Sequence, residues 1–261
     1  MGKKAERINR LVEIIKSKNG ASIKELSSLL GVSEMTVRRD LAILEKNHVV
    51  NNVFGAAIYN PEYKLETDDQ FSYEISQEQI KQDEEKSKIG IFAASLIEPN
   101  DLVVIDTGTT TEMLATHISN DIPATILCYN ANILNSLRLK ENLSLLFAGG
   151  RYHPKTQMVE SPEGVAFINS MRFTKAFISA AGVHTHFGVT CVYPYEVPAK
   201  KAIMKSSLEK ILLLDSTKFD VVKPAYFADL SDFDLVITDS LITDEWRSEI
   251  ERQNIRLHIV E

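Results

Sequence analysis

Cysteine, tryptophan and long apolar runs are scarce in this chain of 261 residues. Its two cysteines, Cys128 and Cys191, lie far apart in apolar or mixed sequence, which predicts reduced thiols; a single bridge between them is the alternative. No apolar run approaches the roughly eighteen residues of a membrane helix, and no signal-peptide core or lipidation motif follows Met1. These absences exclude a disulfide-rich secreted scaffold and predict a soluble, cytoplasmic protein without a membrane partner.

Positive charge is also limited, and it is unevenly distributed. The net charge of −7 argues against a protein that coats nucleic acid. Residues 1–59, however, hold ten Lys or Arg against six Asp or Glu, a balance of +4 that leaves −11 for the rest of the chain. Only the N-terminal part is therefore suited electrostatically to DNA.

Residues 21–46 have the pattern of two short helices joined by a tight corner. Ser22 is placed to cap the first helix, with Glu25 three residues later as in a capping box, and Gly31 gives the corner its backbone freedom. Helical spacing predicts that one face of this helix is buried, comprising Ile23, Leu26, Leu29 and Leu30. The stretch therefore predicts a helix-turn-helix.

The second helix should begin after Ser33 and pack inward through Met35, Val37, Leu41 and Leu44. Its N-terminal half is polar, and this is the half that a recognition helix presents to base edges. A guanidinium can fork onto guanine, and a hydroxyl suits either a base or a phosphate. The candidate DNA contacts are Ser33, Glu34, Thr36, Arg38 and Arg39. The alternative is an ordinary solvated helix face.

The remaining chain divides by composition. The 44% hydrophobic and 25% charged content is ordinary for a globular protein, and the length allows one small and one medium domain. We predict a DNA-binding domain over residues 1–59, with a first helix over residues 5–18, a polar linker over residues 60–78, and a second domain over residues 79–261.

Short continuous apolar runs alternate with helical stretches in the second domain, which predicts an α/β fold with a largely parallel sheet covered on both faces. The predicted strands are residues 102–105, 125–128, 143–147, 176–179, 211–214, 235–238 and 255–259.

Polar residues follow these runs, where parallel sheets bind ligands. The first run leads into DTGTTT, in which Asp106, Gly108, Thr109 and Thr110 precede a helix whose N-terminus can hold an anion. The loop lacks the Gly-Lys ending of a Walker motif, and a plain Ser/Thr-rich helix cap is the alternative.

Other runs end near Asn130, Gly150, Gly182 and Lys218, which we expect to gather around the same ligand. Glu196 and Lys200 stand one helical turn apart, and they fit either a site or an ordinary surface pair. His184, His186 and Cys191 lack a recognisable zinc spacing, so no metal is expected.

The segment GVSEMTVRRDLAILEK resembles the helix-turn-helix signature of DeoR-type bacterial transcriptional regulators. The resemblance implies a winged helix-turn-helix, with residues 49–59 as the wing, although VVNNVFGAAIY lacks the arginine and paired glycine common there. DTGTTT, YNANIL, FAGGRYH, AFISAAGVH and LLLDSTKF look like successive motifs of the DeoR sensor domain, whose fold is similar to ribose-5-phosphate isomerase and coenzyme A transferases.

Family members bind phosphorylated sugars as effectors, and SAAGVH, GVTC and LLLDSTKF most resemble members that respond to deoxyribose-5-phosphate. The resemblance implies effector contacts from Asp106, Gly108, Thr109, Thr110, Asn130, Gly150, Gly182, Glu196 and Lys218.

Three functions fit these observations. The first is an operator-binding repressor, at least dimeric, that deoxyribose-5-phosphate releases. The second is the same repressor with a fructose, tagatose or glycerol phosphate as effector. The third is a sugar-phosphate isomerase or kinase fused to a DNA-binding module, with Glu196 as general base. We favour the first, with no cofactor and no catalytic residues.

Overall fold

The computed structural model describes residues 21–46, 50–53, 56–59 and 82–261, together with Arg7, Arg10, Leu11, Ile14 and Ile15. The predicted linker lies outside the described residues, and so does most of the predicted first helix.

The N-terminal domain contains the predicted helix-turn-helix. Helix α2 (Ile23–Leu30) begins at Ser22, whose Oγ accepts a hydrogen bond from the Glu25 N–H at 3.2 Å. It ends at Gly31, which has the left-handed φ of 64° that a glycine adopts without strain. Helix α3 (Glu34–Lys46) then begins, with the Thr36 N–H donating to Ser33 Oγ at 3.2 Å. The predicted caps and corner are confirmed.

The core of this domain differs from the prediction at two residues. Leu29 is 44% exposed and Met35 is 62% exposed. At about 100° per residue, Met35 falls almost opposite Val37 on α3, and Leu29 lies at the edge of the buried stripe of α2. The hydrophobic core comprises Leu11, Ile15, Ala21, Ile23, Leu26, Val37, Leu41 and Leu44.

The wing is a small antiparallel sheet. Strands β2 (Val50–Val53) and β3 (Ala56–Tyr59) pair with each other, and β3 also pairs with β1 (Ala21–Ser22), so that the wing continues directly from the start of α2. The two-stranded wing is therefore confirmed over residues 50–53 and 56–59, with a third short strand added to it, while residues 49, 54 and 55 lie outside the described part of the chain.

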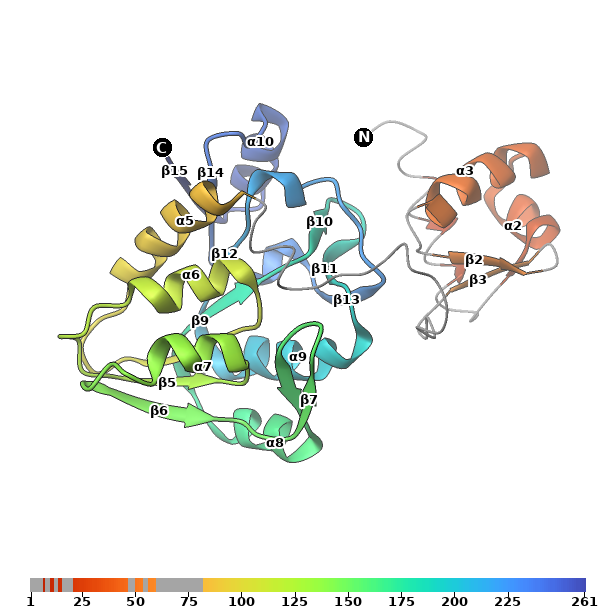
Figure 1. Ribbon diagram of the computed structural model, residues 1–261. Helices are drawn as coiled ribbons and strands as arrows, with labels where there is room; N and C mark the ends of the chain where they lie inside the picture. Colours follow the sequence, from red (N-terminus) through yellow and green to blue (C-terminus); the bar gives the residue numbers. More distant parts are fainter. Residues whose placement is uncertain are drawn as a thin grey trace.

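The second domain is built on a seven-stranded sheet in which every pair of neighbours is parallel (Figure 1). Its strands, in spatial order, are β15 (Arg256–Val260), β14 (Leu235–Asp239), β12 (Ser207–Leu213), β9 (Phe173–Ser179), β4 (Leu102–Ile105), β5 (Ala124–Cys128) and β6 (Leu143–Phe147). All seven predicted strands are in this sheet.

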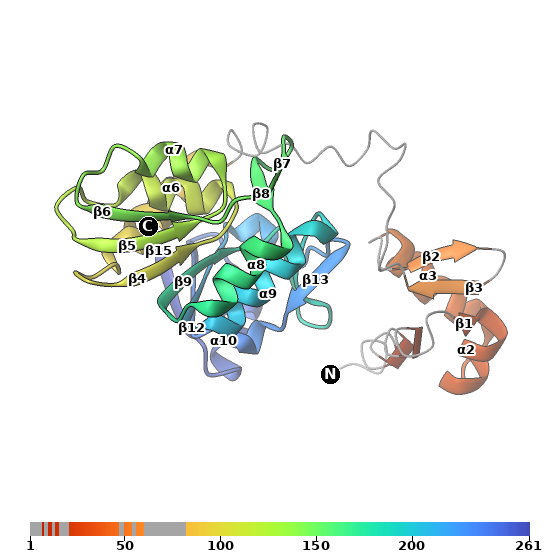
Figure 2. The same cartoon turned by 90° about the horizontal axis from the view of Figure 1, so that it is seen from below.

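Helices cover both faces of the sheet (Figure 2). One face carries α5 (Asp83–Ser95), α6 (Thr109–His117) and α7 (Ala131–Leu137), and the other carries α8 (Pro162–Ser170), α9 (Val197–Ser206) and α10 (Asp244–Arg252). Within β4, Val103 and Ile105 pack in the core beneath α5, α6 and α7, and Val104 packs in the core on the opposite face of the sheet, as the alternation of a strand requires. None of the described helices is long and apolar enough to cross a membrane.

The sequence did not predict two smaller sheets. A hairpin joins β7 (Arg151–His153) to β8 (Met158–Glu160), and an antiparallel sheet contains β10 (Gly182–His184), β11 (Gly188–Cys191) and β13 (Ala225–Ala228). Three 3-10 turns, η2 (Pro194–Glu196), η3 (Ser216–Lys218) and η4 (Leu230–Asp232), complete the described elements.

Among the residues that the structure describes, Phe187 and Val222 of the second domain contact the core of the first. Phe187, in the turn between β10 and β11, is packed in the hydrophobic core of the helix-turn-helix. Val222, which follows η3, packs against the same core.

Candidate functional site

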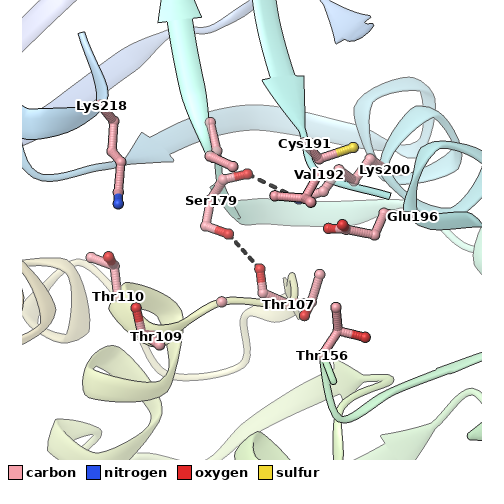
Figure 3. A pocket seen from close by; sticks show the side chains of 13 residues that line it. Thr107, Thr109, Thr110, Thr156, Ser179, Cys191, Val192, Glu196, Lys200 and Lys218 are labelled. Atoms are coloured by element: carbon pink, nitrogen blue, oxygen red, sulfur yellow. Dashed lines mark hydrogen bonds between the residues drawn. The ribbon is translucent and has the colours of Figure 1, made fainter. Parts of the chain in front are cut away.

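A polar pocket lies beyond the carboxyl ends of β4 and β9, between the start of α6 and the start of α9 (Figure 3). This is the edge of the sheet at which the sequence predicted a ligand. The pocket is lined by Thr107, Gly108, Thr109, Thr110, Thr156, Ser179, Ala180, Ala181, Cys191, Val192, Glu196, Lys200 and Lys218.

One end of the pocket is suited to an anion. Helix α6 begins immediately after Gly108, so its first backbone N–H groups have no partner within the helix and face the pocket with Thr109 and Thr110. Only glycine fits at position 108, because a Cβ there would lie 2.3 Å from Ser179 Oγ. Lys218, at the end of η3, brings an ammonium group to the same end (Figure 3).

Asp106 is held by protein groups behind the pocket. One carboxylate oxygen accepts a short hydrogen bond from the Tyr129 hydroxyl. The other accepts from the Ser179 N–H at 3.0 Å and from the Lys200 ammonium, which also donates to Ser179 O at 2.9 Å. Asp106 does not line the pocket and is completely buried, so we assign it to fixing the ends of β4, β9 and α9.

Lys200 and Glu196 are not a surface pair, which corrects that alternative. Lys200 is 1% exposed and Glu196 is 6% exposed. Burial alone lowers the pKa of Lys200, but Asp106 and Glu196 raise it above its ordinary value, so the ammonium stays charged. Burial raises the pKa of Glu196 to about 7, although Lys200 and a hydrogen bond from the Tyr193 N–H oppose that rise.

We expect Glu196→Gln to flatten the pH dependence of stability. The pKa of Glu196 rises from 4.5 to about 7 on folding, so this carboxyl favours the folded state below pH 4.5 and loses that contribution as the pH rises to about 7. The shift corresponds to about 3 kcal/mol. Gln keeps the shape and cannot ionise. We therefore expect the free energy of unfolding, measured in urea, to fall by about that much less across this pH range in the variant than in the original protein.

Glu163→Gln, at an exposed position, is the matched control for this measurement. If Glu196→Gln and Glu163→Gln gave the same pH dependence, the burial assigned to Glu196 would be wrong.

The structure brings together five of the nine residues expected to contact an effector: Gly108, Thr109, Thr110, Glu196 and Lys218. Asp106 and Asn130 lie behind the pocket wall, where Asn130 donates to Thr107 Oγ1 at 2.6 Å and to Thr156 O at 3.1 Å. The other two lie outside this pocket. Gly150 lines a separate hollow with Phe147 and Phe167, and Gly182 lies in β10, where a Cβ would be 2.4 Å from Val221 O.

Eight pocket residues are not among the nine effector contacts predicted from the sequence. Thr107 lies within the predicted DTGTTT motif and Ser179 ends the predicted strand at residues 176–179, so their position at strand ends was a usable signal. Thr156, Cys191 and Val192 come from the small sheets and the loops beside them, whose residues show no periodic pattern. Ala180 and Ala181 directly follow the predicted strand at residues 176–179, and Lys200 was considered with Glu196 as either a site residue or a surface residue.

The two cysteines are free, as predicted, and both are buried. Cys191 Sγ lies 3.5 Å from Ala225 O, whereas the rings of His184 and His186 lie 5.5 Å apart at the other end of the β10–β11 hairpin. Among the described residues, these three do not form a metal-binding group.

The predicted DNA contacts lie at the start of α3. Ser33, Glu34, Arg38 and Arg39 are exposed, and Thr36 is partly buried. The hydroxyls of Ser33 and Thr36 lie 2.9 Å apart, so both take part in the cap of the helix. Among these five residues, Arg38 and Arg39 carry the exposed positive charge.

A winged helix-turn-helix joined to a parallel-sheet domain with a polar pocket defines a two-domain DNA-binding regulator. The chain belongs to the DeoR family of transcriptional regulators: the DeoR-like helix-turn-helix domain matches residues 7–62, and the DeoR C terminal sensor domain matches residues 81–240.

Named relatives match the chain over almost its whole length. The deoxyribose operon repressor of Escherichia coli (strain K12) is 34% identical over 256 residues, which cover 98% of each chain. The HTH-type transcriptional repressor GlcR of Bacillus subtilis (strain 168) is 28% identical, with 98% of this chain and 96% of the relative covered. Ribose 5-phosphate isomerase A of Methanocaldococcus jannaschii shares 15% identity at a TM-score of 0.37, over 51% of this chain and 53% of the isomerase.

Proposed function

We propose that this protein is an operator-binding transcriptional repressor of a sugar or nucleoside catabolic operon, and that deoxyribose-5-phosphate releases it from DNA. The observation that carries the proposal is the pocket, which combines an anion-binding helix start and Lys218 at one end with Glu196 at the other. The 34% identity to a deoxyribose operon repressor supports this choice among phosphorylated sugars.

The phosphate occupies the end formed by Gly108, Thr109, Thr110 and Lys218. Backbone N–H groups at a helix start and a lysine ammonium both favour a dianion. The Glu196 side chain then forms a hydrogen bond with a sugar hydroxyl, accepting it when ionised and donating it when protonated. Asp106 and Lys200 hold the strand ends that frame the ligand, and they do not bind it themselves.

Two segments connect the pocket to the DNA-binding domain. One contains Lys218 and continues to Val222, and the other contains Cys191 and leads back along β11 to Phe187. Both Val222 and Phe187 pack against the core of the helix-turn-helix. A coupling of about 1–3 kcal/mol through these contacts gives a roughly 5- to 150-fold change in operator affinity, which is sufficient for induction.

DNA recognition is assigned to the exposed start of α3, with Arg38 and Arg39 as the principal base or phosphate contacts and Ser33, Glu34 and Thr36 around them. One such domain buries little surface, and operators built from half-sites need paired reading heads. The protein therefore acts as a homo-oligomer, at least a dimer.

An isomerase is the second candidate, because a buried carboxyl whose pKa is about 7 suits a general base. Proton transfer between two carbons also needs a group that stabilises the charge formed on the substrate oxygen. Lys200 is the nearest candidate, but it is bonded to Asp106 and Ser179 O. The repressor is therefore the better assignment.

We expect the full-length protein to bind deoxyribose-5-phosphate more tightly than ribose-5-phosphate, fructose phosphates, tagatose phosphates or glycerol phosphate in calorimetric titrations. The same ligand should dissociate the protein from a DNA duplex that the protein has selected from a random-sequence pool. Tighter binding of another phosphate would keep the repressor and change its effector. Binding of none would contradict the assigned pocket, and turnover of a pentose phosphate would favour the isomerase.

A further inference from the structure

The far wall of the pocket is the turn of the β7–β8 hairpin, and Thr156 is the residue that this turn contributes. Its side chain is buried, with 1% exposure. Figure 3 shows Lys218, Thr109 and Thr110 at one end of the pocket and Thr156 with Glu196 at the other. A ligand whose phosphate lies near Lys218 therefore extends toward Thr156.

The hydroxyl of Thr156 is already engaged by protein groups. Its Oγ1 lies 3.2 Å from the hydroxyl of Tyr195 and accepts from the Met158 N–H at 3.4 Å. Tyr195 does not line the pocket, and in Figure 3 the oxygen of Thr156 turns aside while its methyl group points toward the pocket. The methyl is consequently the part of Thr156 that a ligand meets.

The hairpin turn is fixed in this orientation from several sides. The ring of Tyr195 stacks on His153 at 3.8 Å and on Tyr193 at 5.1 Å between centroids. Asn130 donates to the Thr156 carbonyl at 3.1 Å, and the Ala131 N–H donates to the Gln157 carbonyl at 2.9 Å. Turning the hydroxyl toward a ligand would break its contacts with Tyr195 and Met158.

We propose that the methyl group of Thr156 selects a sugar phosphate that lacks a hydroxyl on a carbon remote from its phosphate. The inference rests on the proposed function, and it concerns the specificity of that pocket. With a 5-phosphate near Lys218, carbons 1 and 2 of a pentose reach the far wall. A methylene at carbon 2 packs on the methyl, whereas a hydroxyl there loses its water without gaining a partner from Thr156. That loss corresponds to about 5- to 150-fold weaker binding.

Two variants separate the methyl from the hydroxyl. Thr156→Ser removes the methyl and keeps the hydroxyl with its Tyr195 and Met158 partners, and Thr156→Val does the reverse. Calorimetry on the full-length protein measures the ratio of the Kd for ribose-5-phosphate to the Kd for deoxyribose-5-phosphate. We expect the ratio to be about five or more in the original protein, to fall to near unity in Thr156→Ser, and to be retained in Thr156→Val.

Lys155→Ala, at the exposed neighbouring position in the same turn, is the control and should leave the ratio unchanged. An unchanged ratio in Thr156→Ser would overturn the inference. So would a ratio lost only in Thr156→Val, because the hydroxyl would then be the selecting group. Equal binding of both pentose phosphates by the original protein would overturn the selection and leave the proposed function standing. Binding of neither would refute the proposed effector itself.

Discussion

Arg39→Ala should abolish specific operator binding and leave the effector pocket intact. At about 100° per residue, position 39 points away from the buried face of α3 that Val37 and Leu41 define, and the side chain is exposed. A guanidinium that contacts a guanine contributes about 1–3 kcal/mol of discrimination. In a dimer both reading heads lose this contact, so a gel-shift or fluorescence-anisotropy titration should show specific affinity falling by about 30-fold or more.

Arg138→Ala is the control for this variant, because it removes an exposed arginine from the second domain. It should leave operator affinity unchanged. Arg39→Ala should also keep the original free energy of unfolding within about 0.5 kcal/mol, since the side chain is at the surface. Normal operator binding by Arg39→Ala would contradict the assignment of Arg39 as an operator contact.

The elements that the sequence predicted are those specified by neighbouring residues. The seven strands of the parallel sheet are continuous apolar runs, and burial on both faces leaves few other structures for them. Ser22, Gly31 and Ser33 fix the boundaries of α2 and α3 through contacts within three to five residues. Such local rules can be applied without knowing the fold.

The details of the pocket depend on contacts between distant residues, which no local pattern contains. Asp106 was predicted to contact the effector, but its carboxylate is bound by Lys200 of α9, which lies 94 positions later in the chain. Asn130 was predicted to do the same, and it instead holds Thr156 through a hydrogen bond spanning 26 positions. Short strands such as β10 and β11 have no periodic signal, so the pocket residues that they and their neighbouring loops contribute were missed.

Lys218→Ala should give a repressor that binds its operator normally and is released only at much higher effector concentrations. Lys218 is the cation at the anion end of the pocket, and losing a hydrogen bond to a charged group costs about 1.5–3 kcal/mol, or roughly 10- to 150-fold in effector affinity. Asp215, which lies 4.0 Å from the Lys218 ammonium, keeps its hydrogen bond from the Thr217 N–H, so η3 should stay in place.

The matched control for Lys218→Ala is the exposed Lys205→Ala, which removes a lysine charge from the same domain outside the pocket. Operator release is measured against the concentration of deoxyribose-5-phosphate. Lys205→Ala should follow the original curve, and Lys218→Ala should need about 10- to 150-fold more effector. Lys218→Arg, which keeps the charge on a different geometry, should fall between them. Because the N-terminal domain is untouched, unchanged operator affinity with a shifted release curve would locate the defect in the pocket, whereas full inducibility of Lys218→Ala would contradict the assigned phosphate end.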